Sequence, residues 1–203
     1  MSSRPSPLQN RVAPDGTLLA DPARGLLMGN RGGQIHAGWR LARRQASRRW
    51  IACTLCFKKR RRQVWQSGYT ELFFLDEATA FAAGHRPCFE CRRSEAKAFA
   101  AAWAAADGLP VPPRADAMDR VLAVQRRHDG PACSALVLPD GAMFAANGLW
   151  LCIAGAARRW SPAGYGPTVP LPTDPVRPLT PAAILAVLRA GYRPLLHPTA
   201  SGG

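Results

Sequence analysis

Hydrophobic residues occur in short runs separated by polar residues along this chain. Two pairs of these runs, each with a turn sequence beside it, predict β-hairpins. Residues 17–19 follow a Pro-Asp-Gly turn and find a possible partner strand in residues 25–28. Residues 142–145 and 149–154 flank Asn147-Gly148, a strong signal for a tight hairpin turn. We expect both hairpins to join one small antiparallel sheet, with the intervening segment inserted between them.

Four other segments have helical spacing. The first covers residues 77–83, with Asp76 as N-cap and Gly84 as its end. The second runs from a Ser94 cap to residue 106 and places Phe99 and Trp103 on one face. Residues 114–127 and a segment that starts at Pro181 complete the set. Short helices beside a small antiparallel sheet define an α+β fold.

Length and composition fit a small folded protein. The 203 residues are 47% hydrophobic and 20% charged, which is enough apolar material for a core. We divide the chain into a basic cysteine-containing part with the N-terminal hairpin, residues 1–110, and a C-terminal α+β part, residues 111–203. The alternative is one continuous domain.

The chain shows no sign of a secretory leader or of a membrane span. Its first residues contain no apolar run, and the longest apolar stretch, 143–157, is interrupted at Asn147 and Gly148. We therefore expect a cytoplasmic protein without a membrane partner. In a reducing cytoplasm, its six cysteines favour metal ligands, nucleophiles or buried thiols over disulfides.

The positive charge is concentrated in one segment. The formal net charge is +14, and residues 22–70 contain twelve basic residues and no acidic one. Such a block favours a polyanionic partner, and DNA is the nucleic acid we expect. A solvated face or a protein partner is the alternative. The predicted nucleic-acid-binding residues are Arg40, Arg43, Arg44, Arg48, Arg49, Lys58, Lys59, Arg60, Arg61 and Arg62, interleaved with Trp39, Trp50, Phe57 and Trp65.

Two C-x2-C pairs give the strongest chemical signal. Cys53 with Cys56 and Cys88 with Cys91 supply four thiolates, the usual ligand set of a structural zinc ion. A redox pair of the thioredoxin kind is the alternative for a single C-x2-C. His85, three residues before the second pair, is an alternative ligand. The remaining cysteines, Cys133 and Cys152, lie in apolar surroundings and are expected to be buried thiols.

The stretch YTELFFLDEATAFAAGHRPCFECRR, residues 69–93, resembles the second half of the N-terminal zinc domain of the Ada DNA-repair protein family. The shared pattern is a strand, a short helix that ends in Ala-Gly, and R-P-C-x-x-C. The resemblance implies a four-cysteine zinc module that contacts DNA. It also implies that Cys53 occupies the place of the cysteine that accepts a methyl group from a DNA phosphotriester. The first pair here is C-x2-C, where the family has C-x3-C.

The sequence therefore predicts a zinc- and nucleic-acid-binding protein associated with DNA damage. A self-methylating phosphotriester repair protein that uses Cys53 is one alternative, and a structural zinc protein that binds a protein partner is another. The chain has no P-loop, dinucleotide fingerprint or G-x-S-x-G motif, so we expect no nucleotide cofactor and no ordinary hydrolase chemistry.

Overall fold

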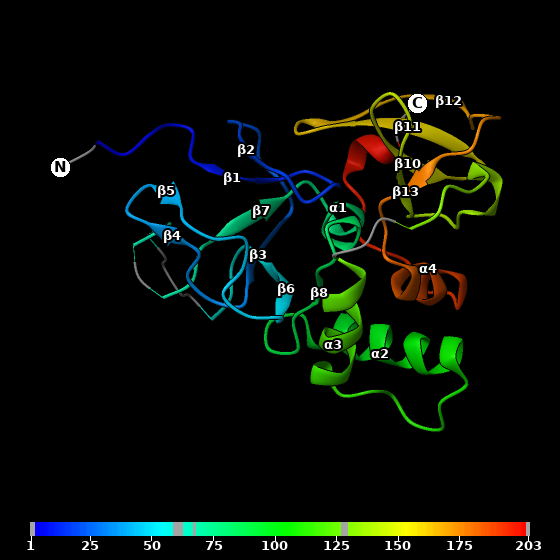
Figure 1. Ribbon diagram of the computed structural model, residues 1–203, viewed down its shortest axis with the longest axis horizontal. Coiled ribbons are helices and arrows are strands. Elements are labelled where there is room, and N and C mark those ends of the chain that lie inside the picture. Colours follow the sequence, from blue (N-terminus) through cyan, green and yellow to red (C-terminus); the bar gives the residue numbers. More distant parts are fainter. Residues whose placement is uncertain (1–2, 59–62, 67, 127–129, 202–203) are drawn as a thin grey trace.

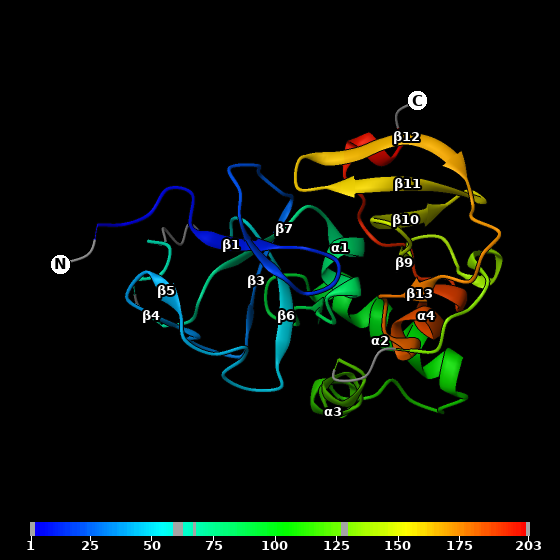
Figure 2. The same cartoon turned by 45° about the horizontal axis from the view of Figure 1, so that its top comes forward.

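A computed structural model describes residues 3–58, 63–66, 68–126 and 130–201. Within these ranges the chain forms a mixed α+β fold with three sheets and four α-helices. The two larger sheets lie on either side of helix α1 (Glu77–Ala82), as both Figure 1 and Figure 2 show. The helices α2 (Arg93–Asp107), α3 (Ala115–Gln125) and α4 (Ala182–Arg189) pack below and beside it.

The first sheet has the strand order β2-β1-β7-β3-β6-β8. Its strands are β1 (Gln9–Val12), β2 (Leu18–Ala20), β3 (Leu27–Arg31), β6 (Trp50–Thr54), β7 (Leu72–Phe74) and β8 (Arg86–Pro87). The pairs β1–β7 and β6–β8 are parallel and the others antiparallel, so the sheet is mixed and not purely antiparallel as predicted. A separate two-stranded ladder joins β4 (His36–Ala37) and β5 (Arg40–Leu41).

The second sheet is antiparallel throughout, in the order β12-β11-β10-β9-β13. Its strands are β9 (Met143–Ala145), β10 (Leu149–Ile153), β11 (Ala156–Ser161), β12 (Gly164–Pro170) and β13 (Arg177–Pro178). The β9–β10 hairpin confirms the prediction made from Asn147-Gly148. Asn147 and Gly148 have φ of 44° and 134°, the left-handed region that such a tight turn requires.

The prediction for the N-terminal hairpin is wrong. Strand β2 pairs with β1, while β3 lies between β7 and β6. All five residues of β3 are buried, which suits a central strand, whereas β2 is partly exposed and suits an edge. The two predicted hairpins consequently belong to different sheets.

The helices follow their predicted positions closely. Asp76 caps α1 by accepting a hydrogen bond from the Thr79 N–H, and Gly108 ends α2 in the left-handed conformation. The N-cap of α2 is Arg92 and not Ser94, whose hydroxyl donates to Glu95 instead. Two 3₁₀ turns, residues Ala135–Val137 and Pro198–Ala200, complete the regular structure.

Helix α1 contributes to every large core cluster. Phe81 packs with side chains from α2, α3, α4 and the second sheet. Ala78 and Ala82 pack against the second sheet, while Ala80 and Ala83 pack against the first. The small alanine side chains let both sheets approach the helix closely. The division into residues 1–110 and 111–203 stays a prediction, although the Phe81 cluster takes side chains from both ranges.

Two buried carboxylates tie the C-terminal segment to α1. Asp76 accepts hydrogen bonds from the Tyr165 hydroxyl at 2.8 Å and from the His197 N–H at 3.1 Å. Glu77 accepts from the Arg92 guanidinium at 2.6 Å, and also from Tyr192 and the Leu195 N–H. The final residues thus return to the body of the protein.

Within the described ranges, no helix has the length and apolar character needed to cross a membrane.

We expect Glu77→Ala to destabilise the fold strongly. The substitution leaves the buried Arg92 guanidinium without its buried carboxylate partner, and breaking such a pair costs about 3–5 kcal/mol. Glu95→Ala is the matched control, because Glu95 lies 3.6 Å from the same guanidinium but is 41% exposed. The control should change the free energy of unfolding by about 1 kcal/mol or less in urea titrations. Equal decreases in the free energy of unfolding for Glu77→Ala and Glu95→Ala would contradict the stabilising role of the buried pair.

Candidate metal centre

Three of the four predicted ligands lie together. The Sγ atoms of Cys53, Cys88 and Cys91 are all within 4.8 Å of one another. Two sulfurs bound to one tetrahedral zinc ion lie about 3.8 Å apart, so a small contraction would bring the three sulfurs to bonding positions. The cluster is largely buried, with Cys53 and Cys88 at 7% and 6% exposure. These three thiols have the donor chemistry and spacing to hold a metal ion such as zinc.

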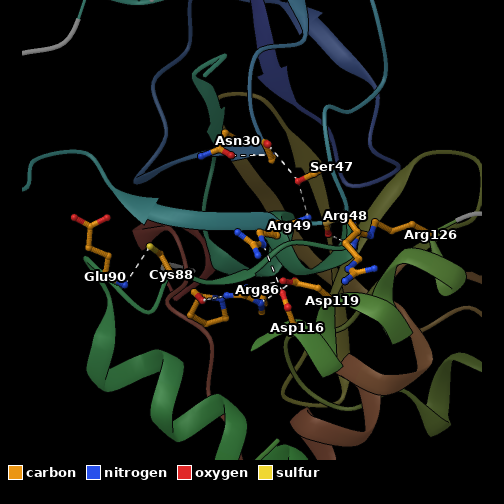
Figure 3. Close-up of polar contacts among 12 residues, drawn as sticks. Asn30, Ser47, Arg48, Arg49, Arg86, Cys88, Glu90, Asp116, Asp119 and Arg126 are labelled. Carbon is orange, nitrogen blue, oxygen red and sulfur yellow. Dashed lines mark hydrogen bonds and ion pairs between the residues drawn. The ribbon is translucent and has the colours of Figure 1, made fainter. Parts of the chain in front are cut away.

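The strands of the first sheet position this cluster. Cys53 lies in β6 opposite Met28 of β3, and the N–H of Cys88 donates to the carbonyl of Ala52 in β6. The chain then turns through residues 88–91, and the Glu90 N–H points at the Sγ of Cys88 at a distance of 3.4 Å. An amide N–H directed at a sulfur stabilises its thiolate form. Figure 3 shows this contact at the start of α2.

Cys56 does not join the cluster, which corrects the four-cysteine prediction. Strand β6 continues through Cys53 to Thr54, so Cys53 sits in extended backbone and not in a tight turn. The side chain of Cys56 is exposed, and its carbonyl accepts a hydrogen bond from the Thr54 hydroxyl. His85 does not join the cluster either, because its ring lies between Trp50 and Phe74.

Hydrogen bonding between the thiols shifts their acidities in opposite directions. Hydrogen bonds from Cys53 and Cys91 lower the pKa of Cys88. Hydrogen bonds to Cys88 and Cys91, together with burial, raise the pKa of Cys53. Hydrogen bonding among the thiols therefore favours the ionised form of Cys88, and a divalent cation bound to the three sulfurs would displace the remaining thiol protons. Beside the sulfurs lies a recess of about 110 Å³, with Tyr69, Glu90 and Asn30 among its lining residues.

The other two cysteines behave differently from each other. Cys152 is buried, as expected, and burial raises its pKa to about 11. Cys133 is only partly buried and pairs its backbone with Val176. Neither belongs to the sulfur cluster.

The described members of the predicted basic set lie in β5, in the loop between β5 and β6, and after β6. The exposed ones are Arg40, Arg43, Arg44, Arg48, Arg49 and Lys58. Lys59, Arg60, Arg61 and Arg62 lie outside the described residues. Two of the interleaved aromatic rings cannot stack on bases in this conformation, because Trp50 and Trp65 are 1% and 3% exposed. Trp39 and Phe57 remain partly exposed, beside Arg4 and Lys58 respectively.

A groove brings three arginines together from two parts of the chain. Arg48 and Arg49 form one side, and Arg120 of α3 forms the other. Arg49 also lies 3.5 Å from the exposed carboxylate of Asp116 (Figure 3). Sequence reasoning missed Arg120, because it lies 71 positions beyond Arg49 in the chain and carries no motif of its own.

A buried ion pair connects this groove to the cysteine cluster. Arg86, two residues before Cys88, donates to both carboxylate oxygens of Asp119, at 2.9 and 2.7 Å. Asp119 neighbours Arg120 on α3, so the bidentate pair fixes the groove relative to the Cys88–Cys91 turn. Figure 3 shows Arg86 between the two regions.

Comparison of the chain with protein-family models, with curated proteins and with solved structures finds no match.

We expect zinc binding to depend on the three clustered cysteines. Purified wild-type protein should contain one equivalent of zinc by elemental analysis, and Cys88→Ser or Cys53→Ser should lose most of it. Cys133→Ser is the control and should keep full occupancy, because Cys133 is outside the cluster. Cys56→Ser should also keep one equivalent, because Cys56 is exposed and lies outside the cluster. Unchanged zinc in Cys88→Ser would contradict the assignment.

Proposed function

We propose that this protein binds zinc through Cys53, Cys88 and Cys91 and uses the adjoining basic surface to bind nucleic acid, with DNA as the expected form. The observation that supports this most directly is the groove lined by Arg48, Arg49 and Arg120. Guanidinium groups from two elements, facing one groove, suit the spaced negative charges of a phosphodiester backbone.

The acids near this groove do not neutralise it. Asp119 is buried and engaged with Arg86, so it is withdrawn from the surface. Asp116 faces Arg49, but both side chains are about half exposed or more, at 49% and 67%. Exposed pairs of this kind are worth about 0–1 kcal/mol, so a phosphate can replace Asp116 as the partner of Arg49.

The metal would act as a structural support in this proposal. It would cross-link strand β6, which carries Cys53, to the turn that carries Cys88 and Cys91. Residues 47–49 lead directly into the N-terminal end of β6, and Arg86 holds α3. Both sides of the groove are therefore attached to elements that the metal would join. Zinc bound by three or four thiolates does not change its oxidation state, which suits it to a structural role.

The resemblance to the zinc domain of the Ada family supports the DNA part of the proposal. Strand β7, helix α1 and the Cys88–Cys91 turn follow one another in the expected order. The further role of Cys53 as methyl acceptor stays a prediction of that resemblance. Cys53 is 7% exposed, and a methyl donor would have to reach it through the small recess beside Tyr69.

We expect DNA binding that weakens steeply with salt. Fluorescence anisotropy of a labelled 20-base-pair duplex should give a linear plot of log K against log salt concentration. The double variant Arg48→Ala/Arg49→Ala should lower the magnitude of its slope by about two, one for each guanidinium group that no longer meets a phosphate.

The control for this experiment removes two positive charges elsewhere. Arg159 and Arg193 are exposed and lie outside the groove, so Arg159→Ala/Arg193→Ala should preserve the slope. Equal effects of the two double variants would indicate only a general charge effect. A flat salt response of the wild type would overturn the proposal and favour the role of a structural protein with a protein partner.

A further inference from the structure

A second pocket, of about 640 Å³, lies where the N-terminal segment meets the first sheet. Residues 3–8 lead into β1 on the side of the molecule that faces away from the second sheet (Figure 2). We call this space the Phe73 pocket; Arg4, Arg11, Arg24, Leu55, Val64 and Phe73 are among the residues that line it. Its described lining has no residue in common with the groove of Arg48, Arg49 and Arg120, so it is a separate feature.

The pocket opens on the face of the first sheet that α1 does not cover. Arg11 of β1 lies opposite Phe73 of β7, and Phe73 lies opposite Met28 of β3. Paired residues of neighbouring strands share one face of a sheet, so these three side chains lie on the same face. The neighbouring residues Val12 and Phe74 point to the other face, where they pack with alanines of α1. The side chains of Arg11 and Phe73 are therefore only partly buried.

The lining of the pocket is positively charged. Three arginines and no acidic residue are among its described lining. Burial lowers the pKa of Arg11, nearby Asp21 acts in the opposite direction, and the charge of Arg24 lowers the pKa further. Asp21 offsets part of the positive charge, but it does not line the pocket. An anion placed between Arg11 and Arg24 would relieve the repulsion between them.

Two of the three guanidinium groups can be reached from solvent. The side chains of Arg4 and Arg24 are both exposed. No hydrogen bond or ion pair engages the Arg24 guanidinium within the described chain. The Arg4 guanidinium lies 5.5 Å from the centroid of the Trp39 ring. A contact with the face of a ring leaves the N–H groups at the edge of the guanidinium able to donate.

The third guanidinium group, that of Arg11, is already fixed in position. Its Nε donates to the Ala23 carbonyl, and its Nη1 donates to the side-chain oxygen of Asn10 at 2.8 Å. Its central carbon lies 4.7 Å from the centroid of the Phe73 ring. The remaining nitrogen, Nη2, is not fully buried and has no hydrogen-bond partner among the described residues. A donor that is held in place loses little side-chain entropy when a ligand binds.

Apolar side chains complete the walls. Leu55, which is 49% exposed, lies in the lining together with Val64 and Phe73. Pockets of this volume hold whole small molecules or parts of larger ones. A group attached to the bound anion would therefore lie against these apolar side chains.

We propose that the Phe73 pocket binds a phosphate group through Arg4, Arg11 and Arg24. A phosphate group offers acceptor oxygens in several directions, which suits three guanidinium groups that come from separate segments of the chain. The group can belong to a nucleic-acid strand or to a free phosphorylated small molecule, and the experiment separates these two sources. The site depends neither on the metal nor on the groove of the proposed function.

The test is protection of the arginines from phenylglyoxal, which modifies accessible guanidinium groups, in the full wild-type chain. The reaction is run with inorganic phosphate, with a 20-base-pair DNA duplex, or with sodium chloride at the same ionic strength, and peptide mass spectrometry locates the adducts. We expect phosphate or the duplex to slow modification of Arg24 at least about fivefold relative to sodium chloride. Arg159 is the internal control, because it is exposed and outside the pocket, and it should react at the same rate throughout.

The two sources give different patterns of protection. Protection of Arg24 by the duplex assigns the pocket to a nucleic-acid strand, whereas protection by phosphate alone assigns it to a free phosphorylated molecule. Failure of both to protect Arg24 beyond sodium chloride would overturn the proposal. The phosphate reaction contains no nucleic acid, so it tests the pocket even where the duplex does not bind and the proposed function fails.

Two variants locate the site. Arg24→Ala should raise the concentration of the protecting ligand that halves the modification of Arg4 by about tenfold, because a charge-assisted hydrogen bond is lost. Arg159→Ala is the matched control and should leave this concentration unchanged. Both side chains are exposed, so neither substitution should disturb the fold, and circular dichroism checks this. Equal effects of the two variants would also overturn the proposal, because the ligand would then lie elsewhere.

Discussion

The arrangement of this protein depends on two carboxylates buried at the start of α1. Asp76 and Glu77 are almost fully shielded from water, where an unpaired negative charge would be very unfavourable. Besides Thr79 and Arg92 nearby, they have partners in distant parts of the chain: Tyr165 in β12 and the backbone N–H groups of the final segment. The helix that separates the two sheets is therefore completed only when residues far along the chain have folded back onto it. The same helix is followed by the strand and turn that carry Arg86 and Cys88, so the position of the cysteine cluster also depends on this contact.

The excess of positive charge is distributed between two environments. On the outside, Arg48, Arg49 and Arg120 face a groove that suits a polyanion. On the inside, Arg31 and its neighbours gather around the ring of Trp50. Water screens the charges of the outer set, whereas Arg31 of the inner set is only 3% exposed. The outer set is the one that the proposed nucleic-acid partner would contact.

The metal cluster shows how far a motif predicts a site. The Cys88–Cys91 pair forms a compact turn with an amide directed at sulfur, as its spacing predicts. The Cys53–Cys56 pair has the same spacing but does not form such a turn, because β6 extends past Cys53 and the exposed Cys56 lies outside the cluster. The spacing in the sequence therefore identified both C-x2-C pairs. Whether the two cysteines of a pair come together depended on whether the backbone there forms a turn or a strand. Arg120 joined the candidate site with no local signal at all.

What the sequence determined by itself is the set of short-range features. The Asp76 cap, the Gly108 helix end, the Asn147-Gly148 turn and the buried faces of the helices all follow from side chains a few residues apart. Tertiary structure alone decided which strand lies beside which and which charged side chains become buried. Strand β2 pairs with β1, and Arg31 and Trp50 leave the surface, because those outcomes depend on burial and on backbone hydrogen bonds between distant segments. These contacts stabilise one particular pairing of strands and one set of buried side chains. No periodicity or spacing of residues along the chain predicts them.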